Sequence, residues 1–403
     1  MDALKTLPNL QHLYVAVQSC QIEIPFHFFT ALRHIDVNEG DHHPVHHQKT
    51  FENLVKMISQ SPLLESIRLS NCSEYNRNKT RSLHHLFEYY PENTPPLRLK
   101  HLFLTNCFVR LDDENVMRHL RHLTSLSLED LLQPRSGYFN DSDSISKDVF
   151  EKRDRWGSSY EQIWRAICTT DLRLEEITVG TIPSAFLEYI GSYSGLKKLN
   201  IKGYINGVTS DSAAEKFYEA LEMHVGSIEE LNIDACYEGL WCFGHHNQAL
   251  FSTLQHLRTL SVKVRSNNIV SRSSKDIIVS LLCHSKSVQS ADSTFVLQRV
   301  LIDTAVTYMP QLEWLFASVA SLEVYRGSKC GSGSSLYHAR SRKEIADRVL
   351  EYQAPLGCKR LPTFKFGSWS PTGAFVGQSP DLLKKGERLR YLPDPVDIDL
   401  NED

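Results

Sequence analysis

The chain has 403 residues, a formal net charge of -4 at pH 7, 41% hydrophobic residues and 23% charged residues. This length exceeds the size at which one compact core stops growing, so the chain forms either several domains or an elongated repeat structure. The small net charge gives no basic surface for nucleic acid or an anionic membrane, and no window approaches 18 uninterrupted apolar residues, which excludes a transmembrane helix.

The first residues and the cysteines both indicate where the protein resides. The opening MDALKTLPNLQHLYV lacks the basic segment of a signal peptide and runs directly into an apolar pattern. The nine cysteines are scattered, without the dense, paired spacing of a secreted disulfide framework. We therefore expect reduced thiols in a cytoplasmic or nuclear protein.

The segment SPLLESIRLSNC, residues 61–72, has the spacing L-x-x-L-x-L-x-x-C, with its first motif leucine at Leu64 and its cysteine at Cys72. This spacing is the signature of a leucine-rich repeat. Each such unit places a short strand beside the next at roughly 4.8 Å, so that the aliphatic rows of stacked units merge into one core. The cysteine position suits a small buried residue that makes a weak hydrogen bond to the backbone. Cys107 and Cys236 take the same position.

The repeat recurs along most of the chain. Its cores begin at Leu10, Leu32, Leu64, Leu99, Leu123, Leu174, Leu196, Ile228 and Leu257, with a weaker one at Leu312. The strong cores start 22 to 51 residues apart, which leaves room for helices between the strands. The pattern predicts an α/β fold, an irregular leucine-rich-repeat solenoid or horseshoe with parallel strands on the concave face and helices on the convex face.

Three segments between the cores carry apolar residues on one helical face. They are FENLVKMISQSP (51–62), SSYEQIWRAIC (158–168) and DSAAEKFYEALEMHVGS (211–227). The second follows the longest gap, the insertion at 129–173, whose first part QPRSGYFNDSDSISK reads as an exposed loop. This insertion is either a plain loop that returns to an ordinary helix or a binding excursion on a rigid scaffold.

The repeat signal fades after about residue 270, which sets the expected domains. We expect a leucine-rich-repeat solenoid over 1–325 and a C-terminal cap or extension over 326–375. The last segment, 376–403, ends in the acidic PDPVDIDLNED and is expected to be disordered.

Chemical motifs are sparse. The segment HHPVHH at 42–47 contains four histidines, but it reads as a polar loop without ligand partners at a recognised metal spacing. The sequence has no G-x-S-x-G elbow, no G-x-x-x-x-G-K-[ST] phosphate loop, no G-x-G-x-x-G and no H-E-x-x-H. We therefore predict a protein that is not an enzyme, with no cofactor and no metal.

The residue between the last two aliphatic positions of each repeat points away from the core, so these residues form a row across the strands. The row reads Tyr14, Asp36, Arg68, Phe103, Ser127, Thr178, Asn200, Asn232 and Ser261. Aromatic residues and arginine are enriched in protein interfaces. The predicted partner-binding residues are Tyr14, Asp36, Arg68, Phe103, Asn200 and Asn232. The alternative is a solvated strand face that binds nothing.

Three phrases carry a resemblance to a known family: IPSAFLEYIGSYSGLKKLNI (182–201), HVGSIEELNIDACYEGLWCFG (224–244) and LQHLRTLSVKV (254–264). Over about residues 1–325 the chain resembles the F-box-associated leucine-rich-repeat proteins of mushroom-forming fungi. The resemblance implies a substrate-recognition scaffold whose F-box binds the adaptor of a cullin-type ubiquitin ligase. The F-box segment itself is not present in this sequence, which opens inside the first repeat, so ligase docking requires an F-box supplied elsewhere.

Two functions remain open. The first, which the resemblance implies, is a protein-protein interaction scaffold that recognises substrates for an F-box-type ubiquitin ligase. The alternative is a stand-alone leucine-rich-repeat protein that binds an unidentified protein partner with no link to ubiquitination. Neither involves nucleic acid or a membrane.

Overall fold

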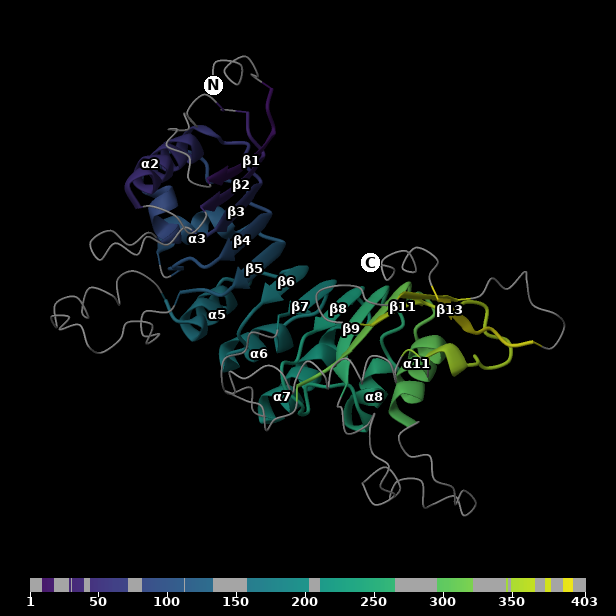
Figure 1. Cartoon of the computed structure of the whole chain (residues 1–403). Helices are drawn as coiled ribbons and strands as arrows, with labels where there is room; N and C mark the ends of the chain where they lie inside the picture. The colour runs from purple at the N-terminus through teal and green to yellow at the C-terminus, as the bar shows by residue number, and fades with distance from the viewer. Residues whose placement is uncertain are drawn as a thin grey trace, which may run out of the picture. The chain divides into compact units, whose positions relative to one another are not determined.

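The repeats form strands at the positions that their spacing predicts, in a computed structural model of the whole chain (Figure 1). The structure describes residues 9–17, 29, 31–39, 44–71, 82–111, 113–132, 158–202, 211–264, 296–321, 346, 349–366, 374–377 and 387–393. These residues belong to two compact units, 1–196 and 197–403. Each unit is a stack of strands with helices on one side, which confirms the α/β leucine-rich-repeat class.

The described residues of the first unit form six parallel strands that pair in chain order. They are β1 His12–Val17, β2 His34–Glu39, β3 Ser66–Ser70, β4 His101–Thr105, β5 Ser125–Glu129 and β6 Glu176–Val179. The register joins equivalent repeat positions: Ile35 lies beside Ile67, which lies beside Leu102. These aliphatic residues are at most 1% exposed, so the merged aliphatic rows form the core.

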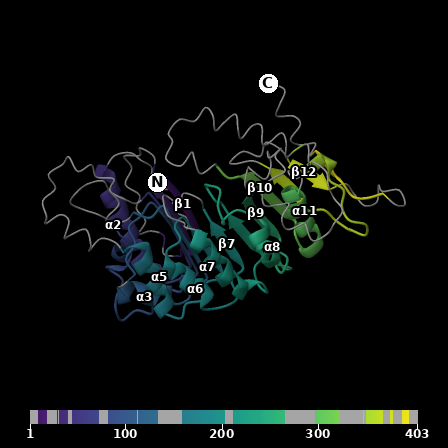
Figure 2. The same ribbon diagram turned by 90° about the horizontal axis from the view of Figure 1, so that it is seen from below.

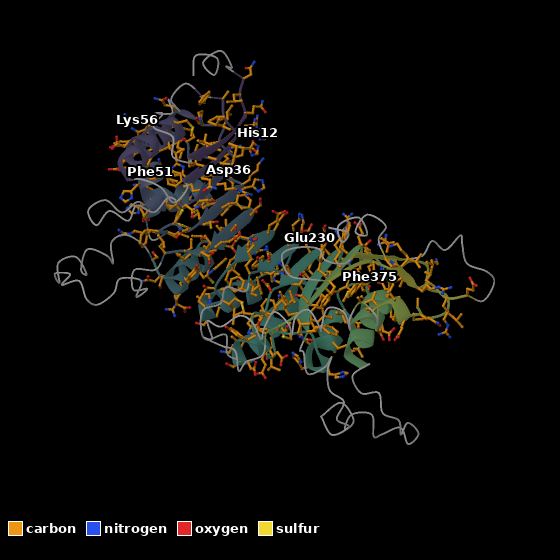
Figure 3. The ribbon with its side chains drawn as sticks, in the orientation of Figure 1. His12, Asp36, Phe51, Lys56, Glu230 and Phe375 are labelled. Atoms are coloured by element: carbon orange, nitrogen blue, oxygen red, sulfur yellow. The ribbon has the colours of Figure 1, made fainter. Side chains whose placement is uncertain are left out.

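Helices cover the other side of these strands (Figure 1). They are α2 Pro44–Gln60, the 3-10 turn η2 Leu83–Phe87, α3 Glu114–Leu120, α5 Tyr160–Thr169 and α6 Ser184–Gly191. Figure 3 shows the two sides of the unit, with His12 and Asp36 on the strands and Phe51 and Lys56 on α2.

Two helices lie where the apolar spacing in this unit predicts them. In α2 the predicted face is buried, with Leu54 and Ile58 fully enclosed. In α5 the indole of Trp164 is also fully buried, with its ring 4.8 Å from that of Phe186 on α6. The α5 helix closes the long insertion as predicted, whereas residues 133–157 of that insertion lie outside the described residues.

The prediction of a loop at HHPVHH (42–47) is partly wrong, because helix α2 already begins at Pro44. Proline is favoured at the first position of a helix, where its fixed φ fits and its missing N–H is not needed. The side chains of residues 42–50 lie outside the described part of the chain.

The second unit continues the same construction and then changes it. Its strands are β7 Lys198–Ile201, β8 Glu230–Ile233, β9 Thr259–Val264, β10 Trp314–Val319, β11 Thr363–Phe366, β12 Ala374–Gly377 and β13 Tyr391–Pro393. The strands from β7 to β11 are parallel, whereas β12 pairs antiparallel with both β11 and β13.

Helices again cover one side of the second unit. They are α7 Asp211–Leu221, the short η3 Glu222–His224, α8 His245–Phe251 and α11 Val296–Tyr308. The α8 and α11 helices lie side by side in Figures 1 and 2, joined by a hydrogen bond of 3.3 Å from Gln248 Nε2 to Thr304 Oγ1. The predicted apolar face of α7 is buried, including Phe217 and Leu221.

The end of the chain differs in part from the expected disordered tail over 376–403, whereas the solenoid over 1–325 and the cap over 326–375 stay predictions. The sheet extends beyond residue 375, because β12 ends at Gly377 and β13 follows at Tyr391. Tyr391 is 1% exposed, so this strand has its own buried anchor. Part of the segment that was expected to be disordered is therefore sheet, and its acidic end, 394–403, lies outside the described residues.

Candidate partner-binding surface

The predicted row of outward-facing residues exists in the first unit as one register across all its strands. Tyr14 lies opposite Asp36, which is followed in turn by Arg68, Phe103, Ser127 and Thr178. Side chains alternate between the two faces of a strand, so residues that flank the buried aliphatic positions must face outward. We call the outward side of β1 to β6 the first strand face.

Arg68 is the centre of this face, because it contacts the row neighbours on both sides. Its Nε lies 3.6 Å from Asp36 Oδ2, and its guanidinium carbon lies 4.4 Å from the centroid of the Phe103 ring. A guanidinium above an aromatic face is attracted by the ring quadrupole. Half of the Arg68 side chain is exposed, which leaves guanidinium N–H groups accessible to a partner.

The two residues beside Arg68 toward the N-terminus complete a mixed surface. Tyr14 is 65% exposed, so its ring and hydroxyl both reach solvent. Burial raises the pKa of the Asp36 carboxyl, and the nearby Arg68 guanidinium opposes that shift. The face thus offers an exposed aromatic ring, a carboxylate and a guanidinium stacked on a second ring.

A histidine row that the repeat pattern did not predict lies two residues earlier on the same face. His12, His34, Ser66 and His101 are register neighbours. The rings of His12 and His34 stack with centroids 4.1 Å apart, and the His101 ring stacks beside Phe103 at 6.5 Å. Burial and then the charge of His12 lower the pKa of His34. This row could have been predicted from the sequence, because a histidine stands two positions before the outward residue in three of these repeats.

The other end of the row is less accessible than the pattern suggested. Ser127 is 3% exposed, and its hydroxyl donates to Glu129 Oε1 at 3.0 Å. The aromatic and charged residues therefore gather on β1 to β4, whereas β5 and β6 present small polar side chains in the same row.

The remaining predicted residues lie in the second unit. Asn200, Asn232 and Ser261 are register neighbours on β7 to β9, as predicted. Asn232 Nδ2 donates to Asn200 Oδ1 at 2.6 Å, so these two side-chain atoms already have a hydrogen-bond partner. The structure thus brings Tyr14, Asp36, Arg68 and Phe103 together in one unit and places the two asparagines in the other.

The end of each repeat explains the cysteine position of the motif. Cys107 is 5% exposed, and its Sγ lies 3.2 Å from the carbonyl oxygen of Thr105. Cys107 thus has the predicted role of a small buried residue, whereas Cys236 at the same repeat position is only partly buried, and Cys72 lies outside the described residues.

A set of polar residues that the motif did not predict stands one position before Cys72, Cys107 and Leu131, the last residues of three successive repeat motifs. Asn71 and Asn106 have φ values of 59° and 52°, and Asp130 has 45°. Asn106 Nδ2 donates to Asn71 Oδ1, and Asn71 Nδ2 donates to Asn38 Oδ1, both at 3.1 Å. Asparagine tolerates this left-handed conformation better than most residues, so we assign this asparagine ladder a structural role and not a role in binding.

Membrane-spanning helices and clustered metal ligands are both missing from the described residues. None of the helices there is long and apolar enough to cross a membrane. That same part of the chain contains no group of three or more His, Cys, Asp or Glu side chains that converges as metal ligands would.

Together, the parallel strand ladders, the helices on one side and the aligned outward rows define an α/β leucine-rich-repeat protein. No family model matches the chain, and no curated protein matches it. Among solved structures, an internalin from Listeria monocytogenes str. 4b F2365 is similar at 13% identity, with 91% of this chain and 84% of the internalin covered and a TM-score of 0.28. The fold assignment rests on the repeats and strand pairing of the chain itself.

Proposed function

We propose that the chain is a protein-protein interaction scaffold that holds a partner on the first strand face. The observation that carries this proposal is the Arg68 side chain, which is held between Asp36 and the Phe103 ring and remains half exposed. A preordered arginine loses less conformational entropy when it binds, and residues of this type supply much of the energy in protein interfaces.

The chemistry of the face favours a protein over a small ligand. Its side chains form a row across neighbouring strands, with Tyr14, His34 and Phe103 offering ring surfaces and Asp36 and Arg68 offering charges. Such a row suits an extended partner surface, which meets several side chains at once. No catalytic constellation is part of this proposal.

The test is a pair of double variants with matched changes on opposite sides of the first unit. Arg68→Glu with Phe103→Ala alters the strand face, whereas Arg121→Glu with Tyr89→Ala alters exposed residues outside it. We expect the first pair to reduce partner capture at least about tenfold, since interface hot spots contribute about 2 kcal/mol or more each. Both pairs should keep the melting temperature within a few degrees, because surface changes cost little.

Equal capture by the two double variants contradicts the proposed surface. Loss of capture with a collapsed melting temperature would instead report unfolding, so the thermal melt is recorded on the same preparations.

The resemblance to F-box-associated proteins supports a finer proposal, that the captured partner is a substrate of a cullin-type ubiquitin ligase. Its test is separate from the surface test. The chain, expressed from its own gene together with any coding sequence that precedes these residues, should co-purify with the ligase adaptor. If the adaptor is absent while the partner is still captured, the scaffold function stands and the ligase link fails.

A further inference from the structure

The second unit carries its own cluster of aromatic and cationic residues on the outward side of its last strands. Trp314 and Phe316 lie two residues apart on β10, with their rings stacked at 6.1 Å and an angle of 17° between their planes. Lys365 on β11 is the register neighbour of Phe316, and its Nζ lies 4.8 Å from the centroid of the Trp314 ring. We call the outward side of β10 to β13 the second strand face.

This cluster repeats the arrangement at the centre of the first strand face. There, His101 and Phe103 stack two residues apart on β4, and Arg68 is the register neighbour that covers Phe103. In both units a cation from an adjacent strand lies over one ring of an i, i+2 aromatic pair. The two sets come from different strands and share no residue.

Apolar side chains extend the second face toward the end of the sheet. Val376 on β12 is the register neighbour of Leu392 on β13, which is 43% exposed, and Trp314 is 38% exposed. The antiparallel register that pairs Lys365 with Ala374 also sets Thr363 opposite Val376. Since Trp314 lies beside Thr363, one row runs from Trp314 through Thr363 and Val376 to Leu392. Phe375, labelled in Figure 3, points to the buried side of the same strand.

The charges on the second unit indicate what this face binds. Within the described bounds of β10 to β13, Lys365 is the charged residue on the outward side. Carboxylates near this face are already paired: Glu313, just before β10, lies 2.8 Å from an Arg258 nitrogen, and Glu230 on β8 lies 3.1 Å from Lys198 Nζ. An apolar surface with one cation complements an apolar segment that brings a carboxylate.

We propose that the second strand face is a separate protein-binding surface, which takes an extended partner segment with an apolar side chain and a carboxylate two positions apart. In an extended segment, residues i and i+2 point to the same side and lie about 6.6 Å apart. One residue packs on Trp314 and Phe316, and the carboxylate pairs with Lys365 beside them.

The test uses two fluorescein-labelled peptides and the full chain. The first peptide is Gly-Ser-Leu-Ser-Phe-Ser-Asp-Ser-Gly, and the second has Lys in place of Asp. Fluorescence anisotropy should show tighter binding of the Asp peptide, by about two- to fivefold, which is the range for an exposed ion pair. Lys365→Glu should reverse this preference. Trp314→Ala should weaken the binding of both peptides by roughly tenfold, as expected for an aromatic residue at the centre of an interface.

Two control variants show whether peptide binding depends on the second strand face in particular. Lys216→Glu makes the same charge change on α7, at an exposed position outside the second strand face, and should leave both affinities unchanged. Arg68→Glu with Phe103→Ala should also leave both peptide affinities unchanged. The peptide test therefore shows whether the second strand face binds, independently of whether the first strand face holds a partner. The proposal is overturned if neither peptide binds at millimolar concentration, if both bind equally, or if Lys365→Glu and Lys216→Glu behave alike.

Discussion

At the scale of single residues, the buried His119 shows how one side chain ties pH to the stability of the first unit. It is fully buried, with its ring 4.6 Å from Phe87 and its Nδ1 accepting the Leu97 N–H at 2.9 Å. Burial, and then the neighbouring Arg118 charge, lower the pKa of His119 to about 4. The native fold therefore holds this histidine neutral.

The sign of the pH effect follows from that lowered pKa. In the unfolded chain the pKa of histidine is about 6.5, so below this pH the unfolded state binds a proton that the folded state refuses. The stability contributed by neutral His119 is complete above pH 6.5 and is lost as the pH falls toward 4, by about 1.4 kcal/mol per pH unit.

The variant His119→Asn isolates this contribution. An asparagine carbonyl oxygen can replace Nδ1 as acceptor for the Leu97 N–H, but it does not titrate. Urea unfolding between pH 4.5 and 7.5 should show a shallower decline in the free energy of unfolding for the variant, even if its stability at pH 7.5 is lower. Identical slopes would mean that His119 does not control the acid sensitivity.

At the scale of elements, the asparagine ladder fixes how strands β3 and β4 end. The N–H of Asn71 donates to Thr105 O at 3.0 Å, and that of Asn106 donates to Glu129 O at 3.1 Å. The positive φ of each asparagine turns the chain out of the strand direction immediately after this N–H. The ladder therefore supplies both the turn and the link between successive repeats.

Substitutions at Asn106 separate these two contributions. Asn106→Gly keeps access to positive φ and loses the side-chain hydrogen bond to Asn71, which is worth about 1 kcal/mol. Asn106→Ala loses the same hydrogen bond and also strains the left-handed backbone, which should add roughly 1 kcal/mol. Chemical denaturation should rank the proteins as wild type, then Gly, then Ala in decreasing stability, and a Gly variant no more stable than Ala would contradict the role of backbone strain.

The strands with aliphatic repeats were predictable, because each core leucine fixes both the strand and its buried side. The weak repeat at Leu312 proved to be a complete strand, β10. The next strand, β11, was missed because phenylalanine replaces the aliphatic residues in LPTFKF, where Leu361, Phe364 and Phe366 keep the repeat spacing and are buried. The outward row predicted from the sequence therefore stopped at Ser261 and omitted Phe316 and Lys365.

The sequence predicted which residues form the candidate site, but not which contacts they make with one another. Repeat phase alone placed Tyr14, Asp36, Arg68 and Phe103 in one register. Phase carries no information on rotamers, so it did not reveal that Arg68 covers the Phe103 ring or that Ser127 is buried. The antiparallel strands β12 and β13 follow no repeat, so the repeat pattern did not reveal them, and the acidic end of the chain led to the expectation of disorder over 376–403.

At the scale of the whole molecule, the chain combines two stacks of repeats, and each stack separates two tasks. The buried rows and the helices provide stability, as Ile35, Ile67 and Leu102 show in the first unit. The outward rows are free to vary, because a residue that faces solvent is not required by the core. Each unit uses this freedom to present a cation beside an aromatic pair.

The central claim is that the first strand face, rather than the helix side of the same unit, holds the protein partner. Two exposed tyrosines test it directly: Tyr14 on β1, which is 65% exposed, and Tyr89 just after η2, which is 59% exposed. Each is replaced in turn by the photo-crosslinking residue p-benzoylphenylalanine, and the full chain is irradiated with its captured partner. We predict a crosslinked product from position 14 and none from position 89. Crosslinking from position 89 alone, or equally from both positions, would contradict the claim.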